Sequence, residues 1–466
     1  MKSYNILAVA ISVIAIITCV AVLMIAFIGN GNDDVSVYNP VSANPPPEAV
    51  SEPFGNSKLE NLDSFSLAAE SILSNIDSFE VSFAEDLNYE SILKMKEKFG
   101  ANTVEAIAKA LENGKITSED MYSIVGYSEK AFLSILNDDL ARTTVLENTE
   151  NGITDLVFVG DVSFADGYSV MNKYKSRNKG AEGLVSEEVL RIMRDATITM
   201  ANNEFTFTTR GAPIPNKMWT FRGNPENVSI YYEMGVDIVG LANNHAFDYG
   251  PDSLSDTLTT LDNAGIARLG AGENLDEAKA PYYYIVNGKK IAIVAGSAID
   301  PYSTRGAKEN QSGVFQIFDT VSMSNEIASA KEKADYVIAY VHWGLESTTV
   351  LTGGQKKMGK AFVDAGADVV VGMHSHCMQG LEYYNGKLIV YSLGNFTFSS
   401  HDLTCGMLKT SIDSEGNFKN VYYPMMQKDN FTYINSGEKG VAQFQQLRDL
   451  CINCEVSDEY EVIEKQ

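Results

Sequence analysis

From about Thr154 onward the sequence repeats one pattern: a short apolar run that predicts a buried strand, then glycine or polar residues, then a stretch of helical periodicity. The clearest run is Val369 to Val371, which ends at Gly372 and is followed by His374 and His376. Strands that alternate with helices are typical of α/β domains. We therefore predict an α/β fold for this part of the chain, with its ligand site where the strands end.

Four of the five histidines lie just past the ends of predicted strands. Because residues i and i+2 of an extended segment point to the same side, the imidazoles of His374 and His376 can converge on one point. Carboxylate and amide groups follow other predicted strands in the same way. Mixed imidazole, carboxylate and amide donors suit a divalent ion such as Zn, Mn or Fe. The residues that we predict to share one site are Asp161, Glu204, Asn244, His245, His342, His374 and His376.

Each of these residues has a simpler explanation when it is taken alone. Asp161 stands where a turn residue is common, Asn243 and Asn244 could cap a helix, and His342 could be a packed core residue. Their shared position at strand ends favours one common site over these separate explanations. With two metal ions close together, such a site could activate a water for attack on phosphorus.

The N-terminus carries an apolar run that is long enough to span a bilayer. Ile6 to Ile28 contains neither a charge nor a proline, and a helix of this length crosses the hydrocarbon core. Lys2 before the run and Asp33 and Asp34 after it favour a cytoplasmic N-terminus. We predict a single-pass membrane anchor over residues 1–29, with the rest of the chain outside the cell. A cleaved signal peptide is the alternative.

The next two segments have distinct compositions. Residues 30–56 are rich in Asn, Ser, Pro and Gly, which is typical of an extended linker. Residues 57–150 are helical in pattern and acidic, with 19 acidic and 8 basic side chains between residues 51 and 150. Asn102 and Glu105 have the spacing of a capping box, and Ser118 and Ser128 are predicted caps of two further helices. We expect an interaction or spacer role for this acidic helical module.

Charge and cysteine content exclude some classes of function. The chain of 466 residues has a formal net charge of −25, which argues against nucleic-acid binding because nothing would offset phosphate repulsion. Its five cysteines are too few for a disulfide scaffold. Cys451 and Cys454 form a C-x-x-C pair that would be able to close a local disulfide in an extracellular protein.

Several longer motifs occur in one order between about residues 154 and 425. They are Phe158-Val-Gly-Asp161, Phe221-Arg-Gly-Asn-Pro225, Leu241-Ala-Asn-Asn-His245 with Asp248-Tyr-Gly250, Leu269-Gly-Ala-Gly272, His342-Trp-Gly-Leu-Glu346, Gly372-Met-His-Ser-His376 with Gln379-Gly380, and Tyr391-Ser-Leu-Gly-Asn-Phe396. These blocks resemble the motifs of the CapA family, proteins associated with poly-γ-glutamate capsule synthesis and export. The resemblance does not extend to the region before residue 150.

The resemblance implies a calcineurin-like metallophosphoesterase fold, a four-layer α/β/β/α sandwich that we place at residues 151–430, with a C-terminal extension at 431–466. It also implies one or two divalent ions, Mn, Zn or Fe. The metal ligands that it implies are Asp161, Glu204, Asn244, His342, His374 and His376. By the same analogy His245 would be the general acid or would stabilise the transition state, and Asp248 would orient its ring.

Substrate binding is assigned to four polar residues near the strand ends. Arg222 is a suitable anion-binding residue because its planar guanidinium fits phosphate or carboxylate. The other three are Asn243, Ser392 and Asn395. The sequence also departs from metallophosphoesterases, which begin with Asp-x-His: here Val162 and Ser163 follow Asp161. Their second Gly-Asp motif is absent too, and Glu204 is the nearest substitute.

The function expected from these features is that of a membrane-anchored extracellular protein in the synthesis or export of poly-γ-glutamate or another capsule polymer. Its partners would be the membrane, other synthesis subunits, and an anionic polymer or phosphorylated substrate, and not nucleic acid. Two alternatives remain open. One is a non-catalytic scaffold of a membrane complex, and the other is an extracellular metal-dependent phosphoesterase unrelated to capsule.

Overall fold

The computed structural model describes residues 63–299, 304–398 and 401–465. The predicted membrane anchor and linker, residues 1–56, lie outside the described residues. Within the described part of the chain, no helix is both long and apolar enough to cross a membrane.

Two β-sheets form the centre of the protein. The first has seven strands in the order β16-β17-β15-β14-β12-β11-β3. Its strands are β3 (Thr143–Val145), β11 (Tyr282–Val286), β12 (Lys289–Ser297), β14 (Tyr336–His342), β15 (Val369–Met373), β16 (Leu381–Tyr384) and β17 (Lys387–Val390). The central strands β12, β14, β15 and β17 are parallel, as expected for strands that alternate with helices.

The second sheet has eight strands. Seven run in the order β21-β20-β19-β4-β5-β8-β9, and β18 pairs with the end of β4. The strands are β4 (Thr154–Val162), β5 (Ile198–Asn203), β8 (Ile238–Gly240), β9 (Ala267–Leu269), β18 (Asn395–Thr397), β19 (Leu403–Ile412), β20 (Phe418–Lys428) and β21 (Phe431–Ile434). Strands β4, β5, β8 and β9 are parallel.

The two sheets pack face to face, and helices cover their outer faces. Along β4, Leu156 and Phe158 join the apolar cluster between the sheets, whereas Val157 and Val159 join the cluster under the helices. Strands buried on both faces explain the continuous apolar runs of the sequence. The helices over the eight-stranded sheet are α8 (Glu187–Asp195), α9 (Ser229–Met234) and α10 (Pro251–Asn263).

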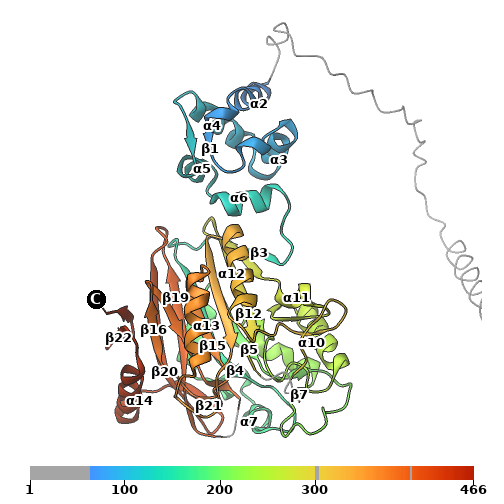
Figure 1. Cartoon of the computed structure of the whole chain (residues 1–466), viewed down its shortest axis with the longest axis vertical. Coiled ribbons are helices and arrows are strands. Elements are labelled where there is room, and N and C mark those ends of the chain that lie inside the picture. The colour runs from blue at the N-terminus through green and yellow to red at the C-terminus, as the bar shows by residue number, and fades with distance from the viewer. Residues whose placement is uncertain (1–62, 300–303, 399–400, 466) are drawn as a thin grey trace, which may run out of the picture. The chain divides into compact units, whose positions relative to one another are not determined.

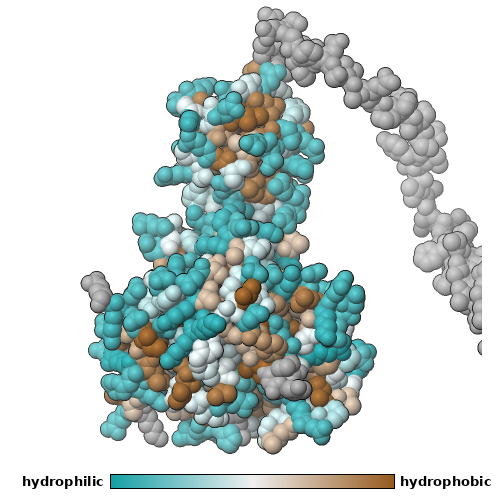
Figure 2. All heavy atoms as spheres, viewed as in Figure 1, coloured by the Kyte–Doolittle hydropathy of each residue, from teal (hydrophilic) through white to brown (hydrophobic). Residues whose placement is uncertain are grey.

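The seven-stranded sheet is covered by α12 (Val321–Lys333) and α13 (Gly353–Asp364), as Figure 1 shows. The predicted α/β class is confirmed, and the two facing sheets flanked by helices that the resemblance implied are present. The outer surface of the sandwich is mostly hydrophilic on the face shown in Figure 2, with small apolar areas between the polar side chains.

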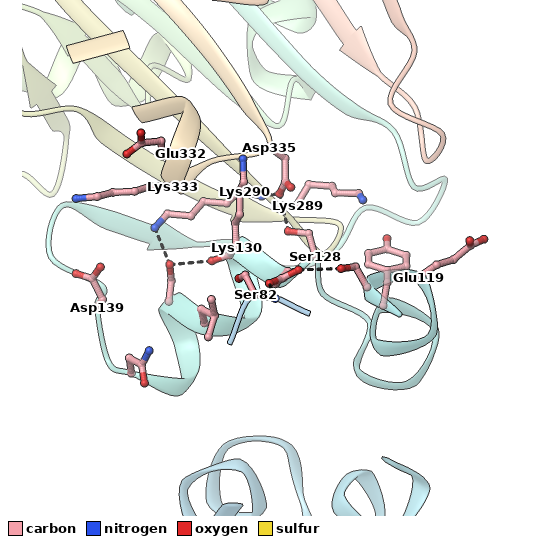
Figure 3. A pocket seen from close by; sticks show the side chains of 16 residues that line it. Ser82, Glu119, Ser128, Lys130, Asp139, Lys289, Lys290, Glu332, Lys333 and Asp335 are labelled. Atoms are coloured by element: carbon pink, nitrogen blue, oxygen red, sulfur yellow. Dashed lines mark hydrogen bonds between the residues drawn. The ribbon is translucent and has the colours of Figure 1, made fainter. Parts of the chain in front are cut away.

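The segment before the sandwich is helical, as predicted, and has an apolar core of its own. Its helices are α2 (Ser64–Ser74), α3 (Tyr89–Phe99), α4 (Ala101–Leu111), α5 (Ser118–Val125) and α6 (Glu129–Leu136). Polar bonds tie α6 to the sandwich: Ser128 Oγ donates to Asp335 at 2.6 Å, and Lys290 Nζ donates to Ser134 Oγ at 2.6 Å. Beside these bonds lies a cavity of about 810 Å³ with lysine and acidic side chains around it (Figure 3).

Two of the predicted helix caps are wrong. Helix α4 starts at Ala101, directly after Gly100, so Asn102 lies inside its first turn and caps nothing. Gly100, with a φ of 89°, is both the C-terminal cap residue of α3 and the residue directly before α4. No other residue therefore lies between the two helices to form an N-terminal cap. Thr117, not Ser118, caps α5. Ser128 does cap α6, because its side chain accepts from the N–H of Ala131.

The edges of the sandwich differ from the predicted range, residues 151–430. Strand β3 precedes residue 151 yet pairs with β11, and β21 follows residue 430 yet pairs with β20. Beyond β21 the chain forms α14 (Gly437–Leu450), β22 (Cys454–Val456) and β23 (Val462–Glu464). The thiols of Cys451 and Cys454 are both free in this structure.

Gly160 gives a test of how tightly the end of β4 is packed. A Cβ at this position would lie 1.8 Å from the carbonyl oxygen of Gly394 and 2.8 Å from its carbonyl carbon. Because backbone atoms cannot swing aside as a flexible side chain can, we expect Gly160→Ala to lower the free energy of unfolding by about 1–3 kcal/mol in urea denaturation. Gly353→Ala is the control, since a Cβ there meets nothing within 4 Å. Equal unfolding free energies for both variants would contradict the tight packing.

Candidate functional site

The polar residues predicted from the strand ends do come together. Asp161 lies near the end of β4, Glu204 follows β5, and Asn244 follows β8, all in the eight-stranded sheet. From the other sheet, His342 ends β14, and His374 and His376 follow β15. The carboxyl ends of both parallel strand sets therefore meet at one place, which is where α/β folds bind ligands.

The first group of side chains is Glu204, Asn244, His342 and His374. His342 Nε2 lies 2.8 Å from Asn244 Oδ1, 3.0 Å from His374 Nδ1 and 3.5 Å from Glu204 Oε1. All four residues are buried. Four atoms that can coordinate a metal ion thus converge where little side-chain surface is exposed to bulk solvent.

The second group is Asp161, Glu204, His376 and Asn395, and it shares Glu204 with the first. His376 Nδ1 lies 3.1 Å from Asp161 Oδ2 and 2.8 Å from Asn395 Oδ1. His376 Nε2 lies 4.0 Å from Glu204 Oε1. Glu204 thus stands between the two groups.

The donor set fits a divalent metal ion. Glu204 Oε1 is buried and has no hydrogen-bond partner among the described residues. Burying an unpaired carboxylate oxygen costs free energy unless a cation or a proton binds to it. In each of two triads, Glu204–His342–His374 and Asp161–Glu204–His376, the ligand atoms lie within 4.8 Å of one another. Imidazole and carboxylate donors together suit borderline ions such as Zn, Mn or Fe.

The pKa shifts of the cluster agree with this chemistry. Burial and the nearby Asp161 charge raise the pKa of Glu204 well above its usual value. Burial and neighbouring cationic groups hold the pKa values of His342 and His374 well below theirs, so both rings are neutral at pH 7. Neutral imidazole is the form that binds metal ions.

The backbone of the histidine loop is strained. His374 has a φ of 91° and His376 a φ of 54°, in the left-handed region that residues with a Cβ rarely adopt. Such conformations cost about 1–3 kcal/mol each and persist where the surroundings fix them. The strain lies at two predicted ligands, which is typical of a functional site.

His245 and Asp248 form a buried pair beside the cluster. His245 Nδ1 lies 2.7 Å from Asp248 Oδ2, which also accepts from the backbone N–H of Phe221 at 2.7 Å. Burial lowers the pKa of His245, and the charge and hydrogen bond of Asp248 oppose that shift. With Nδ1 held by Asp248, Nε2 is the ring nitrogen available for chemistry.

The residues assigned to substrate binding lie in different places. Asn395 contacts His376, as given above. Asn243 holds the turn before His245, whose N–H donates to its Oδ1 at 3.0 Å, and Ser392 Oγ accepts from the N–H of Gly394 at 3.1 Å. Arg222 lines a separate cavity of about 320 Å³, where its guanidinium lies 4.4 Å from the centre of the Tyr249 ring.

Sequence reasoning missed three residues that contact this site. Asn202 Nδ2 donates to Asp161 Oδ1 at 2.8 Å and lies 3.3 Å from His342 Nδ1. Lys217 Nζ donates to Asp248 Oδ1 at 2.6 Å. Phe398 stacks on the His376 ring at 4.7 Å between ring centres. Asn202 had a signal, because it stands at the same strand end as Glu204. Lys217 lies in a segment without periodicity and had none.

Comparisons with known proteins identify relatives of this chain. The family model described as "Bacterial capsule synthesis protein PGA_cap" matches residues 155–400. The chain is 32% identical over 265 residues to the "PGA biosynthesis protein CapA" of Bacillus subtilis (strain 168), a match that covers 55% of this chain and 67% of that protein. It is 36% identical over 177 residues to the "Capsule biosynthesis protein CapA" of Bacillus anthracis, covering 37% and 43% of the two chains.

Among solved structures, the NAD nucleotidase of Haemophilus influenzae is similar with a TM-score of 0.37 and 11% sequence identity, over 66% of this chain and 64% of that chain.

Metal binding can be tested at the shared carboxylate. We expect the full-length protein to bind Mn²⁺ or Zn²⁺, and Glu204→Gln to weaken that binding at least about 10-fold. Replacing a residue that only hydrogen-bonds to a metal ligand already lowers metal affinity by this much. Glu382→Gln is the matched control: Glu382 is also buried, but its partners are Tyr391 and Lys360. Titration calorimetry gives the dissociation constants. A wild type that binds neither ion, or a Glu204→Gln variant that binds as the wild type does, would contradict the assignment.

Proposed function

The chain belongs to the PGA_cap family of bacterial capsule synthesis proteins, and we propose that it is a CapA-like, membrane-anchored protein that acts outside the cell in the synthesis or export of poly-γ-glutamate or a related capsule polymer. One observation carries this proposal. The family match, residues 155–400, contains every side chain of the two groups that converge on the unpartnered Glu204 oxygen.

In this proposal the cluster is a divalent-metal centre of metallophosphoesterase type. Glu204, Asn244, His342 and His374 would hold one ion, and Asp161, Glu204 and His376 would hold a second. A divalent ion bound here supplies Lewis-acid polarisation of a substrate oxygen and lowers the pKa of a bound water.

The chain's own residues supply orientation and proton transfer. Asp248 fixes the tautomer of His245 by accepting at Nδ1, which leaves Nε2 to exchange a proton with the substrate. Hydrolysis of a phosphoester forms a bond from water oxygen to phosphorus and breaks the bond to the leaving oxygen, which takes up a proton. The buried surroundings exclude other water from the reacting atoms. The substrate is a phosphorylated compound or the anionic polymer itself.

The sequence supports the proposed location and partners. The apolar run 6–28 anchors the protein in the cell membrane with the sandwich outside. Other membrane subunits of polymer synthesis are the partners of the acidic helical module, and the net charge of −25 argues against nucleic acid.

A non-catalytic scaffold is the second candidate, and Ser163 favours it. This residue stands where the Asp-x-His motif has its histidine, and its buried hydroxyl has no partner among the described residues. The second ligand group therefore has one imidazole fewer than a complete two-metal centre of that type.

Catalysis separates the two candidates. We expect the full-length, Mn²⁺-loaded protein to hydrolyse bis-p-nitrophenyl phosphate, and His245→Asn to lower kcat by about 10²–10⁴-fold, the usual contribution of a positioned acid or base. Metal content should stay at the wild-type value. His401→Asn, at an exposed histidine, is the matched control. If the wild type holds metal but hydrolyses nothing, and His245→Asn restores surface polymer to a deletion strain, the protein is a scaffold.

A further inference from the structure

We propose that Lys217 is a positioning residue of this centre: its ammonium group fastens the turn that carries Asn244, His245 and Asp248 and so sets the Asn244 amide and the His245 ring in place. The inference rests on the proposed function for its kinetic consequence. The effect of Lys217 on metal binding and on the His245–Asp248 hydrogen bond does not depend on the proposed function.

The Lys217 ammonium bridges two points of the turn. It donates to Asp248 Oδ1 at 2.6 Å and to the backbone carbonyl of Asn244. The lysine side chain is 13% exposed and the Asp248 side chain is fully buried. An ammonium group has three donors, and these contacts direct two of them at residues four positions apart.

Both residues that Lys217 bridges contact residues of the candidate metal site. The side chain of Asn244 belongs to the first ligand group, since its Oδ1 lies 2.8 Å from His342 Nε2. Asp248 Oδ2 is the partner of His245 Nδ1. With Oδ1 on Lys217 and Oδ2 on His245 and the N–H of Phe221, the Asp248 carboxylate has one orientation in which all its bonds are made.

The segment that carries Lys217 depends on these inward bonds. The next two residues, Met218 and Trp219, are 85% and 59% exposed, so their apolar packing does little to hold the segment down. Ile214 instead donates its N–H to the Asp248 carbonyl at 2.9 Å, and Phe221 packs on His245 at 4.5 Å between ring centres. Without the Lys217 ammonium, the turn loses a contact that ties Asn244 to the Asp248 carboxylate behind His245.

The chain offers a matched pair with no link to the centre. Lys331 Nζ donates to Asp368 Oδ2 at 2.9 Å and to the Asp335 carbonyl at 2.7 Å, the same combination of one carboxylate and one carbonyl. Asp335 and Asp368 directly precede β14 and β15, at the opposite ends of these strands from the histidines. Lys331→Met therefore reports what the loss of such a bridge does to stability alone.

The experiment compares Lys217→Met, Lys217→Arg and Lys331→Met in the full-length protein. The readouts are the Zn²⁺ dissociation constant, the Nδ1-bound proton signal of His245 in ¹⁵N-labelled zinc-loaded protein, and kcat and KM for bis-p-nitrophenyl phosphate. We expect Lys217→Met to weaken Zn²⁺ binding and lower kcat by about 10–100-fold each, with KM little changed, and to lose the His245 signal. Lys217→Arg should keep part of the Zn²⁺ affinity, of kcat and of the His245 signal, and Lys331→Met should change none of these three readouts.

Several results would overturn the assignment. If Lys217→Met keeps the wild-type Zn²⁺ affinity and His245 signal and only unfolds more easily, as Lys331→Met should, Lys217 is structural. Where Lys217→Met does not fold, Lys217→Gln replaces it, and wild-type values in that variant are equally decisive. A wild type that hydrolyses nothing ends the proposed function, while the Zn²⁺ and signal measurements still decide the role of Lys217.

Discussion

The structure depends on the burial of both faces of the parallel strands in its two sheets. Residues such as Leu156 and Phe158 fill the space between the sheets, and their neighbours Val157 and Val159 fill the space under the helices. Strands of this kind have no face on which a polar side chain can reach water. The polar groups of the site therefore lie at the ends of the parallel strands, and because the sheets are stacked, the ends of both sets meet. The site is a consequence of the way the core is packed.

Gathering so many polar groups in a buried place requires a further layer of partners. Asn202 donates to Asp161, Asn395 lies against His376, and Asp248 holds His245. Each of these bonds satisfies an atom that would otherwise be buried without a partner, and each also fixes a direction. Glu204 Oε1 has no such hydrogen-bond partner among the described residues, and His342 Nε2 lies 3.5 Å from it. The outer layer orders the cluster around that one atom.

The sequence predicted those site residues that directly follow a predicted strand. An apolar run that ends at a histidine or an aspartate is visible in one dimension, so the convergence of Asp161, His342 and His374 could be expected before any coordinates. Lys217 could not, because it comes from an irregular segment and reaches the site only through the fold. The left-handed φ of His374 is likewise invisible in a sequence. The prediction that Asn102 caps a helix was wrong. The capping-box spacing does not reveal that Gly100 caps the end of α3 and that α4 starts at the next residue, Ala101.

The two groups of candidate ligands are chemically unequal, and this difference explains the importance of Glu204. The first group offers two neutral imidazoles and an amide, so Glu204 supplies its only negative charge. The second has Asp161 as well, and its histidine is different: burial lowers the pKa of His376, but the hydrogen bond and charge of Asp161 outweigh that and raise it. At the sequence position where the Asp-x-His motif has its histidine, this chain has Ser163. A divalent ion in either group must therefore take most of its charge balance from carboxylates, and Glu204 is the one carboxylate that both groups share.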